Sequence, residues 1–242
     1  MTTMPPNAPT IVALIRHGQA AAPDPEGRFL SKGPVGLTAV GEQQSVHVGK
    51  LLRGLRIAAI HASDLLRARQ TAEIIARTID LPVEYDDQLR EVDCGNLDGS
   101  TVEELERSNP AFLPWVRAGF EQGFASNADH LDPTLRFPGG ESITDMAERA
   151  VAALRRICER HRGRCVVIVS HAWVTSVILC HVMDVPVSRY FRFGQPNAGL
   201  SVVRVAPDGR GMLDGLNIAA SFDIVAGGSL PVRDHSLTTG RG

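Results

Sequence analysis

Two apolar runs of strand length constrain the fold of this chain more than any other feature. Residues 11–15 read Ile-Val-Ala-Leu-Ile, and residues 165–169 read Cys-Val-Val-Ile-Val. Neither run alternates apolar and polar positions, so both faces of each strand must be covered. We therefore expect the two runs to be central strands of a sheet that carries helices on both sides.

Helical patterns lie between the expected strands. Apolar residues recur at helical spacing over 39–53, 65–79 and 142–161, as on a helix with one buried face. The last helix follows Ser142, a good N-cap, with Asp145 three residues later.

Shorter apolar segments predict further strands at 57–60, 198–205 and 212–219. Strands that alternate with helices indicate an α/β fold, here a three-layer sandwich with a largely parallel central sheet.

Length and charge exclude several classes of protein. A chain of 242 residues with 43% hydrophobic residues fits one domain, which we place at 11–225 between flexible ends at 1–10 and 226–242. The net charge of −2 argues against nucleic acid or an anionic membrane as partner. No stretch has the roughly 20 apolar residues that span a bilayer, and residues 1–10 show neither the basic nor the apolar region of a signal peptide. We expect a cytoplasmic protein.

The four cysteines predict neither a metal site nor a redox pair. No Cys-x-x-Cys spacing links them, so buried free thiols are expected. They are Cys94, Cys158, Cys165 and Cys180.

Residues 110–138 are unusually aromatic for this chain. Two interpretations stay open: an apolar cluster beneath long loops, or a lid inserted over a pocket. The aromatic residues are Phe112, Trp115, Phe120, Phe124 and Phe137.

Histidines follow both apolar strands. The first runs into Arg16, His17, Gly18 and Gln19, and the second ends just before His171. Ligands of parallel sheets gather at the carboxyl ends of the strands. If the two strands are neighbours, both imidazoles face one cavity.

Two further segments carry residues suited to phosphate chemistry. Ser63 or Asp64 can cap the helix that contains Arg67. In the first turn of that helix the arginine joins backbone N–H groups that favour an anion. Glu91 and Asp93 lie on one face of an extended segment.

Together these motifs resemble the histidine phosphatase superfamily, the phosphoglycerate mutase-like group. The resemblance covers roughly residues 10 to 205 and rests on six segments in family order. They are Leu-Ile-Arg-His-Gly at 14–18, Leu-Thr-x-x-Gly-x-Gln at 37–43, Ser-Asp-Leu-x-Arg-Ala-x-Gln-Thr-Ala at 63–72, Leu-Arg-Glu at 89–91, Pro-Gly-Gly-Glu-Ser at 138–142 and Val-Ser-His at 169–171.

The resemblance implies a role for each matching residue. His17 would be the nucleophile and Glu91 the proton donor, while Arg16, Arg67 and His171 would bind the phosphoryl oxygens. Gln19 is a further candidate for substrate binding, and Asp93 is the reserve candidate for the acid.

The same residues make chemical sense for a phosphatase. A phosphoryl group in transfer carries spread negative charge, which two arginines and a protonated His171 can stabilise without magnesium. His17 must attack as a neutral ring, and neighbouring guanidinium groups lower its pKa in that direction. Glu91 must instead stay protonated long enough to donate to the leaving oxygen.

Three alternatives stay open beside a phosphatase that acts on small phosphate esters through phosphorylated His17. The first is a phosphoglycerate mutase, although 110–138 lacks the paired arginines that the resemblance would imply for one. The second is a member that binds phosphorylated ligands without turnover. The third is a metal hydrolase, for which ordered ligands are missing. We expect no metal or cofactor, and the sequence leaves the oligomeric state open.

Overall fold

A six-stranded sheet forms the centre of the protein. The computed structural model describes residues 8–21, 28, 30–114 and 132–218. The strand order is β3-β2-β4-β1-β5-β6, with β3, β2, β4 and β1 parallel and β5 and β6 each antiparallel to the preceding strand in that order. The strands are β1 (Thr10–Arg16), β2 (Ile57–Ala62), β3 (Val83–Tyr85), β4 (Cys165–Ser170), β5 (Leu200–Val205) and β6 (Gly211–Gly215).

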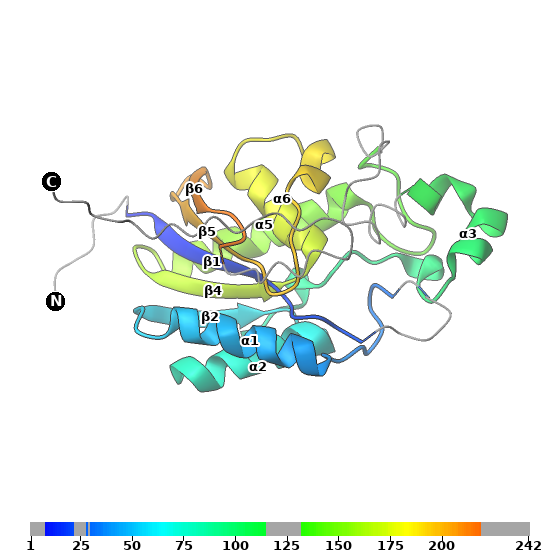
Figure 1. The fold of residues 1–242 in the computed structure, drawn as a ribbon. Coiled ribbons are helices and arrows are strands. Elements are labelled where there is room, and N and C mark those ends of the chain that lie inside the picture. Colours follow the sequence, from blue (N-terminus) through cyan, green and yellow to red (C-terminus); the bar gives the residue numbers. More distant parts are fainter. Residues whose placement is uncertain (1–7, 22–27, 29, 115–131, 219–242) are drawn as a thin grey trace, which may run out of the picture.

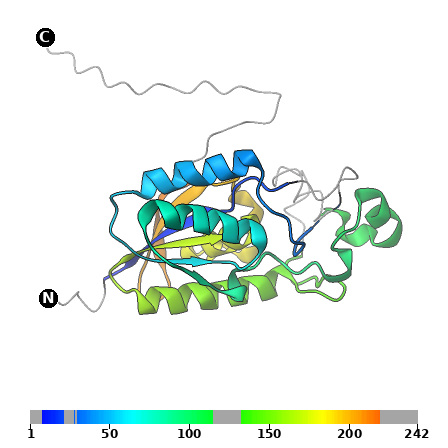
Figure 2. The same cartoon turned by 90° about the horizontal axis from the view of Figure 1, so that it is seen from below.

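Helices cover both faces of this sheet. Helices α1 and α2 pack on one face and α5 and α6 on the other, and Figure 2 shows α1 and α5 on opposite sides of the strands. The predicted three-layer sandwich is therefore confirmed. The helices are α1 (Ala39–Leu52), α2 (Leu66–Ile79), α3 (Val102–Ser108), α5 (Ile143–Arg160) and α6 (Ala172–Val182), with short 3₁₀ turns at Asp87–Leu89, Gly95–Leu97, Pro110–Phe112 and Val187–Arg192.

Strand β1 is buried on both faces, as its continuous apolar run predicts. Val12 and Leu14 pack in the cluster with α5 and α6, whereas Ala13 and Ile15 pack with α1 and α2, and none of the four is more than 3% exposed. Each fully buried Val, Leu or Ile contributes about 1.5–3 kcal/mol to folding.

The predicted cap of α5 is confirmed and that of α2 is wrong. The hydroxyl of Ser142 accepts a hydrogen bond from Asp145 N, and the carboxylate of Asp145 accepts one from Ser142 N. Helix α2 instead follows Leu65, which has no capping side chain. Asp64 pairs with Arg90, and Ser63 contacts His171, because both side chains turn toward the neighbouring strand ends.

Several elements differ from the sequence-based expectation. Strand β3 and helix α3 were not expected, and β6 ends at Gly215. Strand β3 has three residues on the sheet edge, too few for a pattern. Cys94, Cys158 and Cys180 are buried thiols as expected, while Cys165 is half-buried.

The aromatic segment is only partly described. Phe112 and Phe137 are 8% and 2% exposed, and their ring centroids lie 5.2 Å apart in the core. These two rings therefore support the first interpretation, an apolar cluster. Trp115, Phe120 and Phe124, together with most of both predicted flexible ends, lie outside the described residues.

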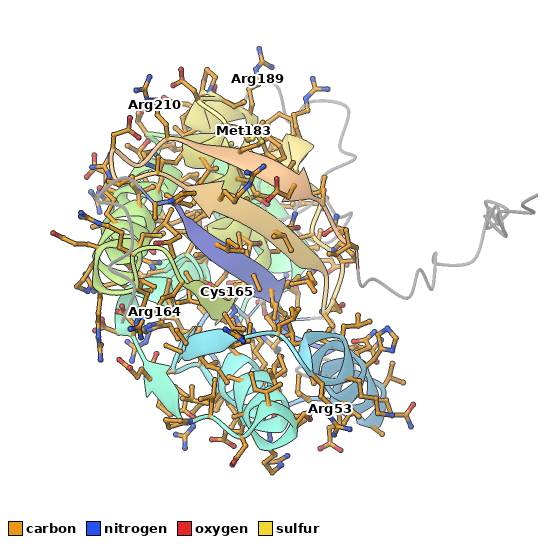
Figure 3. All side chains as sticks on the ribbon, turned by 90° about the vertical axis from the view of Figure 1, so that its left-hand side faces the viewer. Arg53, Arg164, Cys165, Met183, Arg189 and Arg210 are labelled. Atoms are coloured by element: carbon orange, nitrogen blue, oxygen red, sulfur yellow. The ribbon has the colours of Figure 1, made fainter. Side chains whose placement is uncertain are left out.

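The carboxyl ends of β1, β2 and β4 meet at one end of the sheet, the end toward which the strand arrows point to the right in Figure 1. Figure 3 looks onto the opposite end, where Cys165 begins β4. Across the described ranges, no helix combines the length and the apolar character needed to cross a membrane.

Candidate active site

The two strand-end histidines lie side by side. Strands β1 and β4 are paired, and His17 extends the pairing by donating its N–H to Ser170 O at 2.9 Å. The ring centroids of His17 and His171 are 5.2 Å apart, with an angle of 60° between the ring planes. His17 is 7% exposed and lines a pocket, whereas His171 is fully buried beside it. The expected proximity of the two rings is confirmed, but only His17 lines the pocket that both were expected to face.

The hydrogen bonds of His17 define its tautomer. Its Nδ1 lies 2.7 Å from Gly18 O, and because a carbonyl only accepts, Nδ1 carries the proton. Nε2 therefore presents a lone pair, to which Arg67 Nε donates at 3.2 Å. Burial, followed by the charges of Arg67 and Arg16, lowers the pKa of His17 well below its ordinary value. The ring is neutral near pH 7, as a nucleophile requires.

Gly18 lets the chain turn beside α1. A Cβ at this position would lie 2.4 Å from Gly41 O, so any other residue would push the segment away from the helix. Gly18 N also donates to the hydroxyl of Thr71 in α2 at 3.0 Å. These contacts hold His17 at a defined distance from Arg67, because Thr71 donates in turn to Arg67 O at 2.8 Å.

Two guanidinium groups border the pocket. Arg67 lies in the first turn of α2, is 5% exposed, and donates from Nη2 to Ser31 O at 2.6 Å. Arg16 donates from Nη1 to Gln195 O at 2.5 Å, and its buried Nε has no partner among the described residues. Burial lowers the pKa of Arg16 to about 10, so both groups stay positive at neutral pH and can bind phosphate oxygens.

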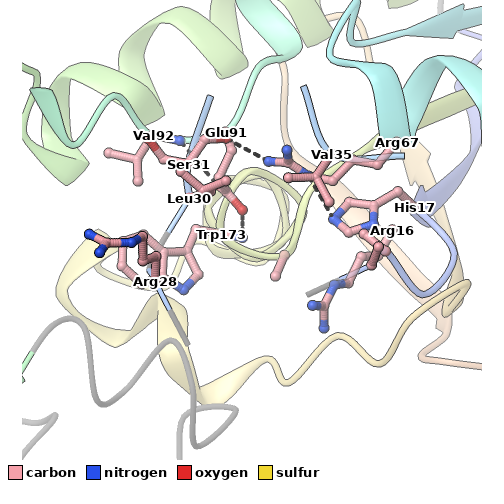
Figure 4. Close-up of a pocket in the computed structure, with 13 residues that line it drawn as sticks. Arg16, His17, Arg28, Leu30, Ser31, Val35, Arg67, Glu91, Val92 and Trp173 are labelled. Atoms are coloured by element: carbon pink, nitrogen blue, oxygen red, sulfur yellow. Dashed lines mark hydrogen bonds between the residues drawn. The ribbon is translucent and has the colours of Figure 1, made fainter. Parts of the chain in front are cut away.

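Glu91 lies in the same pocket with its carboxylate at the start of α6 (Figure 4). Its oxygens accept hydrogen bonds from Val92 N at 3.1 Å and from Trp173 N at 3.3 Å. Burial raises the pKa of Glu91 above its ordinary value, although Arg67 and the two N–H groups oppose the shift. A carboxyl with a raised pKa can act as a general acid near neutral pH.

A half-buried ion pair holds the loop that carries Glu91. Arg149 on α5 donates to Gln88 O, Arg90 O and Glu91 O at 2.7–3.1 Å, and to both carboxylate oxygens of Glu141. Glu141 belongs to the Pro-Gly-Gly-Glu-Ser segment at 138–142. This ion pair gives that sequence segment a physical role, since it orients the loop of the candidate acid.

Beyond these charged groups the pocket is mostly apolar. Its volume is about 290 Å³. Sequence reasoning missed Ser31 and Trp173: Ser31 lies in a loop without a pattern, whereas Trp173 could have been found from its place two residues after His171. The remaining lining residues are Ala20, Ala21, Arg28, Leu30, Val35, Val92 and Ala172.

Besides the buried His171, two sequence-based candidates lie outside the pocket lining. The side chain of Gln19 accepts a hydrogen bond from Thr38 Oγ1 at 2.8 Å, so it supports the start of α1. Asp93 accepts from Gly95 N at 2.8 Å and from Lys32 Nζ at 2.7 Å. Neither residue lines the pocket beside His17.

The surroundings of His171 in the free protein oppose the protonated state that the sequence analysis considered for it. Burial, then the positive charge of Arg67, lowers the pKa of His171 well below its ordinary value. His171 is therefore neutral near pH 7, and any hydrogen bond it offers a ligand comes from a neutral ring. In the described part of the chain, no three His, Cys, Asp or Glu side chains group to hold a metal ion.

Comparison with known proteins identifies the class to which this fold and site belong. A sequence profile described as histidine phosphatase superfamily (branch 1) matches residues 12–218. The chain belongs to this superfamily, as its motifs indicated.

Among the proteins to which this chain is similar, two carry different activities in their names. The chain is 31% identical over 190 residues to the probable phosphoglycerate mutase GpmB of Salmonella choleraesuis (strain SC-B67), covering 78% of this chain and 82% of the relative. Bacillus stearothermophilus YhfR superposes with a TM-score of 0.71 at 28% identity, over 85% of this chain and 96% of YhfR. A mycobacterial glucosyl-3-phosphoglycerate phosphatase matches the fold with a TM-score of 0.71 at 24% identity, over 86% and 98% of the two chains.

Proposed function

We propose that this protein is a metal-independent phosphatase that hydrolyses small phosphate monoesters through a phosphohistidine at His17. One observation carries the proposal. The unprotonated Nε2 of a neutral His17 adjoins a pocket that also holds Arg16, Arg67 and Glu91. This set supplies a nucleophile, fixed positive charge and an acid within one cavity.

The first half-reaction transfers the phosphoryl group to the protein. Nε2 of His17 forms a bond to phosphorus while the ester P–O bond breaks, and the carboxyl proton of Glu91 passes to the leaving alkoxide oxygen. Arg16 and Arg67 stabilise the charge on the three phosphoryl oxygens.

The second half-reaction returns the site to its starting state. A water oxygen bonds to phosphorus, the P–N bond to His17 breaks, and the Glu91 carboxylate takes a proton from that water. Inorganic phosphate then leaves, and Glu91 is again protonated.

Hydrolysis is favoured over mutase activity by the chemistry of the pocket wall. Apart from Arg16 and Arg67, Arg28 is the one cationic side chain among the described lining residues, and it lies 3.5 Å from Glu104 and donates to Gly99 O at 2.9 Å. A mutase must hold a second anionic group of its substrate. The alternative, supported by the name of the relative GpmB, is a phosphoglycerate mutase.

The intermediate can be sought directly. Purified protein is mixed with ³²P-labelled ester, quenched within milliseconds in alkali that spares the P–N bond, and mapped by peptide. We expect label on the peptide that contains His17, none in His17→Ala, and unchanged labelling in His47→Ala, whose side chain is exposed on α1. Turnover of His17→Ala at the native rate would refute the nucleophile.

Two further measurements separate the alternatives. With 3-phosphoglycerate, isomerisation faster than phosphate release would identify a mutase. Phosphate affinity without release from any ester in a broad panel would identify a binding protein. Turnover should also survive EDTA, because the arginines supply the charge that magnesium supplies elsewhere; activity lost on chelation and restored by one ion would refute the metal-independent chemistry.

A further inference from the structure

Ser63 and His171 form a buried pair behind the pocket. Ser63 follows β2 and donates its N–H to Val169 O at 3.0 Å, which sets it beside the end of β4. Its Oγ lies 2.8 Å from Nε2 of His171, and both residues are fully buried. Because the pair is shielded from water, the direction of this hydrogen bond is decided by the groups around it.

The donor count at Ser63 indicates that direction. A serine hydroxyl has one proton to donate and lone pairs that accept. Leu65 N donates to Ser63 Oγ at 3.3 Å, and within the described residues the other partner shown for that oxygen is His171 Nε2. Among the described residues Nε2 is thus the one acceptor available to the hydroxyl proton. We take that proton to point at Nε2. Since His171 is neutral, its own proton must reside on Nδ1.

Nδ1 of His171 is left in need of a partner. The atom is buried and has no hydrogen-bond partner in the described part of the structure. A buried N–H without an acceptor costs about 1–3 kcal/mol. The groups that act on the ring electrostatically include Arg67, Arg16 and His17, and the two arginines offer only donors. The phosphoryl group that the proposed function places beside His17 brings the missing acceptor.

We propose that Ser63 is a positioning residue that fixes His171 in the Nδ1–H tautomer, so that this neutral ring donates to a phosphoryl oxygen during transfer to His17. The inference rests on the proposed function for its acceptor, but the tautomer is a property of the protein without substrate. In this arrangement His171 contributes a directed hydrogen bond, and the two arginines contribute the positive charge.

Nitrogen-15 NMR of histidine-labelled protein tests the tautomer without any turnover. His171 is assigned by its loss in His171→Asn. We expect a pyridine-type shift for Nε2 and a pyrrole-type shift for Nδ1 in the native protein, and a downfield Nδ1–H proton when inorganic phosphate is added. Protonated Nε2 in the native protein would overturn the proposal, while phosphorylation of His17 would still stand. A correct tautomer in a protein that releases no phosphate would instead overturn the proposed function and leave the role of Ser63 in fixing the tautomer standing.

Replacing Ser63 tests whether the tautomer of His171 matters for turnover. In Ser63→Ala, Nε2 loses its donor, so the Nε2–H tautomer should appear and kcat should fall about tenfold to hundredfold with little change in KM. Ser63→Thr keeps the hydroxyl and should restore both the tautomer and kcat.

Ser176→Ala is the matched control, since the hydroxyl of this buried serine lies 2.8 Å from Ala172 O and from Phe193 O and makes no hydrogen bond with the ring of His171. It should leave the tautomer unchanged. Native tautomer and native kcat in Ser63→Ala, with a native melting temperature, would refute the positioning role.

Discussion

Nε of Arg67 donates a hydrogen bond to Nε2 of His17 across 3.2 Å. The lone pair that would attack phosphorus is thus engaged by a cation before substrate arrives. Burial lowers the pKa of His17, and the same cation lowers it further, so Arg67 helps to keep the ring neutral and also orients it. A phosphoryl oxygen that accepts from Arg67 would release this lone pair at the moment of binding.

Replacing Arg67 should therefore change the pH dependence as well as the rate. In Arg67→Gln one charge that depresses the pKa of His17 is gone, so the ring protonates at higher pH and the acid limb of kcat/KM moves upward. Loss of a charged hydrogen bond also costs about 1.5–3 kcal/mol, or roughly tenfold to hundredfold in kcat/KM at pH 8. The control is Arg69→Gln on the exposed side of α2. An unshifted acid limb would show that Arg67 does not govern the pKa of His17.

Glu91→Gln should expose the need for a proton donor. Its raised pKa keeps the native carboxyl protonated to higher pH than an ordinary glutamate, so activity falls as pH rises through that pKa. The amide cannot donate an acidic proton, and kcat should fall about a hundredfold to ten-thousandfold for alkyl phosphates but much less for p-nitrophenyl phosphate. Asp93→Asn is the comparison. If this variant, and not Glu91→Gln, loses more kcat for alkyl phosphates than for p-nitrophenyl phosphate, Asp93 is the acid.

Trp173→Ala should alter the choice of ester. The indole lines the pocket together with Leu30 and Val92, so its removal takes away apolar surface that would contact the alcohol part of the substrate. We expect kcat/KM to fall about tenfold for aromatic esters and little for glycerol phosphate, with unchanged inhibition by inorganic phosphate. For Trp173→Phe we expect a kcat/KM for aromatic esters between those of the native protein and Trp173→Ala. An equal loss for every ester, in step with the melting temperature, would make this residue structural only.

Acid should destabilise the fold through a second histidine pair. His61 and His161 share a hydrogen bond between their Nε2 atoms at 3.1 Å, so one ring must donate and the other must accept through an unprotonated nitrogen. Burial lowers the pKa of both. Below about pH 6.5 the unfolded rings bind protons that the folded rings exclude. The free energy of unfolding therefore falls as pH decreases, by up to about 1.4 kcal/mol per pH unit for each proton.

Urea unfolding between pH 5 and pH 8 measures this slope. In His61→Asn we expect the free energy of unfolding to decline less steeply as pH decreases, because one of the two titrating rings has been removed. The native slope should remain in His47→Gln, whose side chain is exposed. A native slope in His61→Asn would show that other groups carry the acid sensitivity.

Much of the fold was predictable because its strongest signals are local. The two apolar runs, the spacing of α5 and the capping pair of Ser142 with Asp145 each lie within about 20 residues, and the structure confirms all of them. Helix α3 carried a similar signal, since Thr101 and Glu104 form a capping box that sequence reasoning overlooked. Strand β3 carried none, since three residues on a sheet edge have no period.

By itself the sequence determined which residues could carry the chemistry. Strand ends, glycine at the turn and a cation at a helix start are properties of short segments, and these pointed to Arg16, His17, Arg67 and His171. Membership of the superfamily followed from the same motifs in order.

Only the tertiary structure decided how those groups behave. Segments that are far apart in the chain determine the neutral state of His171 and the contact of Ser63 with its ring. They also determine that Gln19 bonds to Thr38 and Asp93 to Lys32. Protonation depends on burial and on charges within a few ångströms, and a hydrogen bond depends on which donor and acceptor meet. These surroundings are set only when the sheet brings β1, β2 and β4 together.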